Sequence, residues 1–158
     1  MGMVEEFADQ VPVTLTGMVD GKPRTVTVHL QRCTMRHHGL FAAWCRDLTM
    51  QRCRALAAEL PEDGRKVAIE HACKLVISDC DLGGPINTAL LSSPTGIAKM
   101  MHLLMPADEQ RAVSVADLLE LIPQADQSQI SAALLTANGV TEAEAKQKNP
   151  PVAGTPAR

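Results

Sequence analysis

The chain has 158 residues, the length of one ordinary globular domain. Its 46% hydrophobic and 21% charged residues are typical of a folded protein and exclude a disordered one. Aromatic residues make up only 2%, with no tyrosine, which argues against a stacking platform for single-stranded nucleic acid. The core must therefore be built from aliphatic residues, cysteine and the eight methionines.

The N-terminal residues 1–10 are acidic and carry no base, whereas a signal peptide has a basic region followed by an apolar one. No apolar run approaches the roughly 20 residues that cross a bilayer. The five cysteines are an odd, scattered set, which fits small hydrophobes in a reducing compartment better than a disulfide framework. We therefore expect a flexible acidic N-terminus, a cytoplasmic location and no membrane association.

Residues 12–30 predict a β-hairpin. Apolar residues alternate with polar ones, mainly threonine, on both sides of Asp20-Gly21, a dipeptide that supplies the positive φ angles of a tight turn. Val26, Val28 and Leu30 share one face of the second strand. Because a lone hairpin is marginally stable in water, we expect this face to pack on the helices that follow.

Residues 34–140 predict a helical body, because apolar residues recur at helical spacing between Ser, Thr, Pro and Gly boundaries. Thr34 is the expected N-cap of the first helix. This helix is expected to bury a stripe from Leu40 to Leu60, and the next, opening at Pro61, to bury residues including Val67 and Ile77. Shorter helices are expected to begin at residues 93–94, 114 and 126–128 and to end near 105, 122 and 137, with Gly83-Gly84-Pro85 as a turn between helices and Asn138-Gly139 as a C-cap.

Residues 141–158 contain three prolines and no Leu, Ile, Phe or Met, which predicts a disordered C-terminal tail. The fold class expected is therefore mainly α. It consists of a single small helical domain over residues 11–140 with an N-terminal β-hairpin.

The best metal candidate is the group Cys33, His37, His38 and Cys45. Zinc sites usually present their ligands as close pairs such as C-x₂-C, and the chain contains no such pair. Buried cysteines beside surface histidines explain the pattern better, so we expect no metal and no cofactor.

Neither cysteine considered as a nucleophile has a workable partner. Cys73 lies two residues from His71, a spacing that puts the side chains on different sides of a helix. Cys80 lies between Asp79 and Asp81, and neighbouring carboxylates raise a thiol pKa. No catalytic residues are predicted, and we do not expect an enzyme.

Residues 22–54 carry seven basic residues against Asp47 alone. This segment could face phosphates, an acidic partner protein or the chain's own acidic flanks. The helix pair predicted at 115–122 and 128–137 resembles a helix-turn-helix, but its second helix contains no Arg or Lys. We therefore expect duplex DNA to bind weakly or not at all.

The methionine-rich stripe of Met100, Met101, Leu104 and Met105 is the candidate partner-binding surface. Methionine is flexible and polarizable, so it adapts to varied partners. Packing in the core is the alternative for these side chains.

The order of elements resembles the small tail-assembly chaperones of tailed bacteriophages over about residues 11–140. The resemblance rests on the hairpin (14–30), the Trp44 helix segment (40–46), and the segments 115–122 and 135–139. It implies a non-enzymatic protein that coats the long tape-measure protein in the host cytoplasm and keeps it soluble before the tail tube polymerises. The family has no catalytic residues to transfer, and the five cysteines and His37-His38 have no role in that picture.

The predicted function is thus that of a phage tail-assembly chaperone that binds a protein partner, with self-association a further expectation. Two alternatives stay open. A structural virion or tail adaptor component would pair its hairpin edge to edge with neighbours. A small DNA-binding regulator would use the basic segment 22–54.

Overall fold

The computed structural model describes residues 10–139, so the expectations for residues 1–9 and for the tail 141–158 lie outside the described residues. The chain divides into two compact units. One unit comprises the residues up to Cys33 and those from Leu104 onward, and the other comprises Thr34–Leu103. We call them the hairpin unit and the helical unit. The expectation of a single domain over 11–140 does not anticipate this division and stays a prediction.

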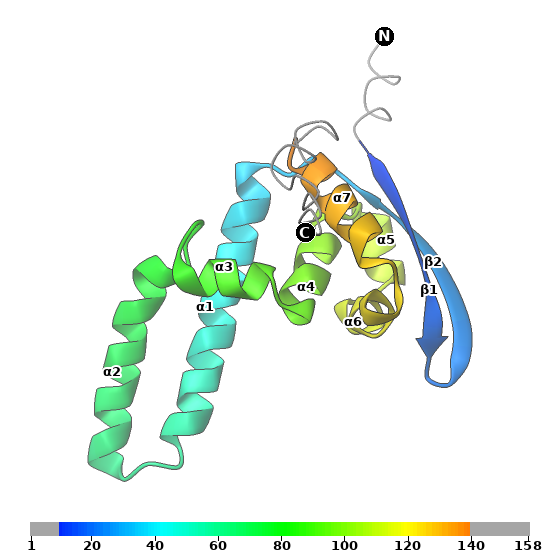
Figure 1. Cartoon of the computed structure of the whole chain (residues 1–158). Helices are drawn as coiled ribbons and strands as arrows, with labels where there is room; N and C mark the ends of the chain where they lie inside the picture. Colours follow the sequence, from blue (N-terminus) through cyan, green and yellow to red (C-terminus); the bar gives the residue numbers. More distant parts are fainter. Residues whose placement is uncertain (1–9, 140–158) are drawn as a thin grey trace, which may run out of the picture. The chain divides into compact units, whose positions relative to one another are not determined.

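The mainly α fold with an N-terminal β-hairpin is confirmed (Figure 1). Strands β1 (Val11–Val19) and β2 (Lys22–Leu30) pair antiparallel, with Leu15 opposite Val26. The turn residues Asp20 and Gly21 have φ angles of 51° and 74°, as a two-residue type I′ turn requires. The Asp-Gly signal therefore located the turn correctly.

One face of the hairpin forms the core of its unit. Helices α6 (Val115–Leu121) and α7 (Gln127–Ala137) pack against β1, which confirms that the hairpin needs helices to cover it. The strand residues that are fully buried on this face are Val13, Leu15, Val28 and Leu30. The opposite face carries threonine pairs, with Oγ1 atoms 3.0 Å apart in Thr14–Thr27 and 3.2 Å apart in Thr16–Thr25.

The helix boundaries predicted in the hairpin unit are confirmed at α6 and α7. Ser114 Oγ accepts the N–H of Asp117, and the Asp117 carboxylate accepts the N–H of Ser114, each at 3.1 Å, forming a capping box. Asp126 Oδ1 accepts the N–H of Ser128 at 2.9 Å and starts α7. Two short elements, α5 (Ala107–Ala112) and the 3₁₀ turn η1 (Ile122–Gln124), were not predicted.

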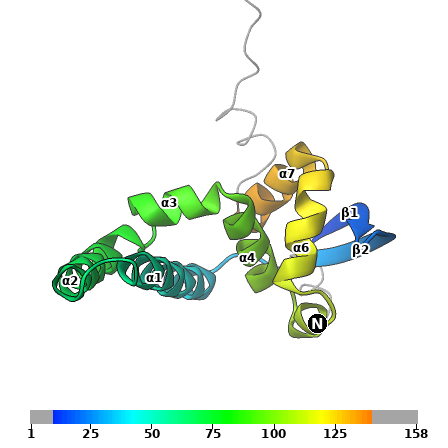
Figure 2. The ribbon, with the colours of Figure 1, turned by 90° about the horizontal axis from the view of Figure 1, so that it is seen from below.

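The helical unit is built on an antiparallel pair of helices. Helices α1 (Met35–Ala57) and α2 (Glu62–Asp79) lie side by side (Figures 1 and 2) and are followed by α3 (Pro85–Leu91) and α4 (Pro94–Leu104). Thr34 is the N-cap residue of α1, as predicted, and its N–H donates to Nδ1 of His37 at 3.0 Å. The segment predicted only as a turn at Gly84-Pro85 begins the seven-residue helix α3.

The burial predicted for α1 and α2 is confirmed at Phe41 and Val76 but wrong at several other large residues. Leu56, Val67 and Ile77 are 68%, 59% and 72% exposed, whereas Ala72 and Val76 are buried. Val67 and Ile77 stand five residues before and after Ala72, which puts them about 140° from it around the helix. Apolar residues surround α2 on nearly every side, so their spacing alone did not identify the buried face.

Candidate functional site

The methionine-rich stripe predicted to bind a partner is buried. Met100, Met101, Leu104 and Met105 are at most 3% exposed, so the alternative of core packing is confirmed and these side chains do not face outward to a partner. Helix α4 has only one fully charged residue, Lys99, among its eleven residues. A helix that is apolar on nearly all sides belongs in a core. These four side chains therefore offer no surface to a partner.

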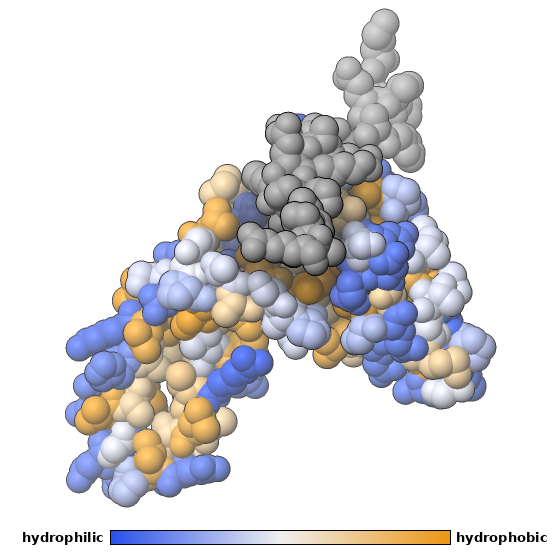
Figure 3. Space-filling view, viewed as in Figure 1, coloured by the Kyte–Doolittle hydropathy of each residue, from blue (hydrophilic) through white to orange (hydrophobic). Residues whose placement is uncertain are grey.

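Exposed apolar side chains concentrate in the helical unit. Of the ten large hydrophobic residues exposed within residues 10–139, eight belong to this unit. Figure 3 shows apolar residues in orange among polar ones over the α1–α2 pair. Exposed apolar side chains mark an interaction site where they form a contiguous patch. We call these eight residues the apolar surface: Met35, Leu40, Leu56, Leu60, Val67, Leu75, Ile77 and Leu82.

The buried side chains of the α1–α2 pair are mostly small. Apart from Phe41 and Val76, the residues buried there are Ala42, Cys45, Ala57, Ala72 and Cys80. Small side chains remove little apolar area from water when two helices pack. Six larger apolar side chains of the same helices are exposed to solvent: Met35, Leu40, Leu56, Val67, Leu75 and Ile77. The sequence signal for this arrangement was the excess of apolar residues around α2.

A pocket of about 280 Å³ opens at the start of α1. Met35 and Leu82 of the apolar surface line it, and Arg46 Nη1 lies 2.9 Å from Asp81 Oδ1 beside them. This ion pair is largely exposed and contributes little to stability. The pocket is a recess in which an apolar side chain of a partner can insert. The other lining residues are His38, Gly39 and Ala42.

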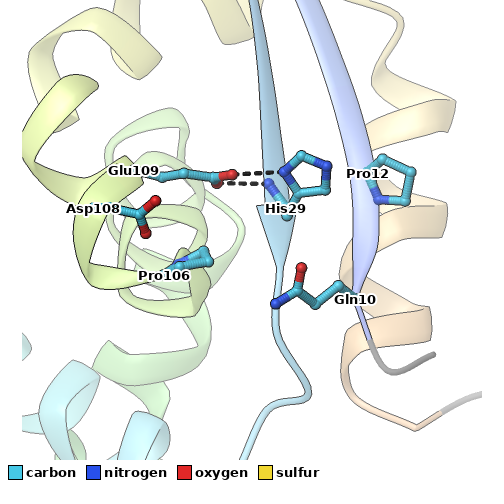
Figure 4. Close-up of a pocket in the computed structure, with 6 residues that line it drawn as sticks. All are labelled: Gln10, Pro12, His29, Pro106, Asp108 and Glu109. Atoms are coloured by element: carbon cyan, nitrogen blue, oxygen red, sulfur yellow. Dashed lines mark hydrogen bonds and ion pairs between the residues drawn. The ribbon is translucent and has the colours of Figure 1, made fainter. Parts of the chain in front are cut away.

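A second pocket, of about 570 Å³, lies in the hairpin unit where α5 meets β2 (Figure 4). Glu109 accepts the backbone N–H of His29 at 2.8 Å and lies 2.6 Å from its ring Nδ1. This two-point contact fixes α5 to the strand. The remaining lining residues are Gln10, Pro12, Pro106 and Asp108, which give the pocket an acidic and proline-rich wall.

The candidate metal ligands have other roles. Among the described residues, no group of three or more His, Cys, Asp or Glu side chains is placed to hold a metal ion. His37 accepts the N–H of Thr34 through Nδ1, which requires a neutral ring nitrogen. Burial lowers the pKa of His37, with Arg36 and His38 contributing, and so favours that neutral form.

The surroundings of two thiols favour their protonated form. Burial raises the pKa of Cys33, and it raises the pKa of Cys45 to about 11, with Cys80 adding to the effect. A thiol with a raised pKa is a poor nucleophile, because the thiolate is the reactive species. Cys73, on α2, is exposed.

The basic segment 22–54 makes ion pairs within each unit. Arg24 Nη1 lies 2.9 Å from Asp117 Oδ1, and Arg46 pairs with Asp81 at the same distance. Two of its seven basic residues therefore meet carboxylates of the chain's own acidic segments. For these two residues, pairing with the chain's own acidic segments is therefore favoured over contact with phosphates.

No family model, curated protein or solved structure matches this chain. Within the described part of the chain, no helix is both long and apolar enough to span a bilayer.

Proposed function

We propose that this chain is a non-enzymatic, protein-binding assembly factor that holds a helical segment of a client protein on the apolar surface of α1 and α2. The observation that carries the proposal is the burial pattern of this helix pair, in which several large apolar side chains are exposed and alanines are buried. Leu56 and Ile77 are exposed, while Ala57 and Ala72 of the same helices are buried. An amphipathic client helix would contact such a surface through its own apolar side chains, spaced at positions i, i+3, i+4 and i+7 along the client.

The class of assembly factor we propose is a phage tail-assembly chaperone, and the client is a tape-measure protein in the host cytoplasm. A long helical client displays many different apolar stripes, so its chaperone needs contacts that tolerate variation. Met35 is the most exposed residue of the apolar surface, and its unbranched side chain adapts to different shapes. The order of elements that resembles the tail-assembly chaperones supports the same choice.

Co-expression with a tape-measure-like client tests the proposal. The wild-type chain is expected to raise the soluble yield of the client, and the double variant Leu56→Ser/Ile77→Ser to lose most of that effect. Leu119→Ser is the matched control, because Leu119 is also exposed but lies on α6 in the hairpin unit.

All variants should keep the thermal unfolding midpoint of the wild-type chain, since exposed side chains contribute little to stability. A client that is equally soluble without this chain would contradict the proposal. Equal loss of client solubility in the Leu119 control would contradict the assignment of the surface.

A further inference from the structure

The pocket of about 570 Å³ in the hairpin unit has both acidic and apolar walls (Figure 4). The described residues that line it include Asp108 and Glu109, and none of them is a lysine or an arginine. Pro12 and Pro106 supply apolar ring surface. Figure 4 shows the Asp108 side chain directed from α5 toward the space between α5 and β2. A ligand that complements this pocket therefore carries positive charge beside small apolar groups.

The two carboxylates of the pocket differ in their partners. Glu109 binds His29 with both oxygens, since Oε2 accepts the backbone N–H at 2.8 Å and Oε1 lies 2.6 Å from the ring Nδ1. Asp108 is exposed and has no ion pair within residues 10–139. Asp108 is thus the carboxylate of this wall that is available to a base from another part of the chain.

The chain has two segments outside residues 10–139, and their charges differ. Residues 1–9 carry three acids and no lysine or arginine, so the acidic wall repels them, although they join the pocket at Gln10. Residues 145–158 carry three bases and no acid. Like charges at close range cost free energy, whereas opposite charges attract. Charge complementarity therefore selects the C-terminal segment as the occupant of the pocket.

Residues 146–151, with the sequence Lys-Gln-Lys-Asn-Pro-Pro, combine positive charge with small apolar groups. We call them the lysine–proline segment. Lys146 and Lys148 stand two positions apart, so an extended segment presents both ammonium groups on one side. Pro150 and Pro151 follow, and proline side chains lose almost no conformational freedom on burial. The segment therefore matches a pocket that offers two carboxylates and two proline rings.

This segment is tethered within reach of the pocket. The N–H of Cys33 donates to the carbonyl of Ala137 at 2.7 Å, and Cys33 follows the pocket residue His29 by four positions. Four residues span at most about 14 Å, whereas the nine from Ala137 to Lys146 span up to about 30 Å. Lys146 can therefore reach the carboxylates. A short tether holds two groups at an effective concentration of order millimolar, so a weak contact is sufficient.

We propose that the lysine–proline segment binds the pocket of about 570 Å³ in its own chain. The two lysines lie against the carboxylates of Asp108 and Glu109, and the proline pair packs on the proline rings of the wall. Bound in this way, the segment covers the pocket and keeps it from other basic peptides. Binding in a pocket requires no hydrophobic core within the segment itself, so its lack of large apolar residues is no obstacle.

Carbodiimide cross-linking of the full chain tests the proposal, because this reagent joins a carboxylate to a lysine amine that lies against it. Mass spectrometry of the digest should find a carboxylate of the pocket joined to Lys146 or Lys148. We expect at least about tenfold more of this product than of links from the same lysines to Glu120, since binding raises the local concentration. Glu120 is the matched control, because it is exposed on α6 of the same unit. The yield should be independent of protein concentration, as a contact within one chain requires.

Amide chemical shifts of the isotope-labelled full chain test the contact without a reagent. The double variant Lys146→Ser/Lys148→Ser is expected to shift the signal of Asp108. The matched double variant Lys66→Ser/Lys74→Ser, which removes two exposed lysines from α2, is expected to leave that signal unchanged.

A digest without these links overturns the proposal, and so do links spread evenly over the carboxylates of the hairpin unit, because tethering without binding gives that result. Links found only between two copies also overturn it, since the occupant is then another chain. An Asp108 signal that is the same in both double variants, or that responds instead to Glu5→Ser/Glu6→Ser, overturns it as well. None of these outcomes depends on client binding by α1 and α2.

Discussion

The two units bury apolar residues in opposite ways. Among the described residues of the hairpin unit, nearly every buried hydrophobic side chain is large, as Leu15, Leu118 and Ile130 illustrate, and only Met18 and Leu119 of residues 10–33 and 104–139 are large and exposed. In the helical unit, alanine and cysteine make up more than half of the buried hydrophobic set, while eight large side chains face solvent. The described part of the hairpin unit therefore buries most of its large hydrophobic side chains, whereas the helical unit exposes eight of its own.

This contrast has an energetic consequence. Burial of a methylene group stabilises a fold by about 0.8 kcal/mol, so a leucine in a core contributes far more than an alanine. The hairpin unit therefore draws its stability from its large side chains. In the α1–α2 pair, the large side chains that are exposed, such as Leu56 and Ile77, can be changed at little cost to folding.

The largest expected effect is a core truncation in the hairpin unit. Leu15→Ala removes a fully buried side chain and should lower the free energy of unfolding by about 2–5 kcal/mol. The same change at Leu56, which is 68% exposed, should alter it by less than about 0.5 kcal/mol. Urea unfolding of both variants measures the difference. Equal losses in the free energy of unfolding would contradict the contrast between the two units.

The next-largest expected effect compares two glycines of the helical unit, one in tight packing and one facing open space. A Cβ added at Gly96 in α4 would overlap the carbonyl of Leu90, whereas one added at Gly39 in α1 meets open space. Gly96→Ala should therefore destabilise the chain by about 1–3 kcal/mol. Gly39→Ala should stabilise it by about 0.5–1 kcal/mol, because alanine favours a helix interior. Thermal unfolding distinguishes the two, and a tolerated Gly96→Ala would show that α3 and α4 separate readily.

The secondary structure could be predicted where local chemistry decides it. Asp20-Gly21 located the hairpin turn, and Thr34, Ser114 and Asp126 located helix starts, because each acts through its own backbone neighbours. Helices α3 and α5 were missed because six or seven residues are too few to show a helical period.

The candidate site could not be predicted from periodicity, because burial depends on what packs against each helix. Met101 and Ile77 both belong to apolar stretches, yet one is fully buried and the other is 72% exposed. Gln124 and Glu109 likewise carried no signal in the sequence. Their roles at the strand edges arise from contacts with Met18 and His29, which are distant in the chain.

A smaller effect concerns the cap of α6 in the hairpin unit. Hydrogen bonding from the backbone N–H of Ser114 lowers the pKa of Asp117 below its ordinary 3.8, with Arg24 contributing. A carboxyl with a lowered folded pKa stabilises the fold above its unfolded pKa, and this stability is lost as the pH falls through the folded value. Ser114→Ala should cost about 1 kcal/mol at neutral pH. Asp117→Asn should reduce the fall in the free energy of unfolding between about pH 5 and pH 2. An unchanged pH dependence would contradict the stabilising role given to the Asp117 carboxylate.

The smallest effect on stability, and the sharpest probe of the helical unit, is thiol labelling. Cys73 is exposed on α2, so a maleimide should modify it in the native chain and leave the free energy of unfolding nearly unchanged. Cys45 and Cys80 are fully buried, and burial raises the pKa of Cys45 to about 11, so both should react only when the helices separate. Mass spectrometry over a labelling time course measures each rate, with Cys73→Ser as the control. Labelling of Cys45 as fast as Cys73 would mean that the α1–α2 pair opens freely in the absence of a client. Slow labelling of Cys45, further slowed when a client is bound, would show that the client covers a helix pair that is already formed.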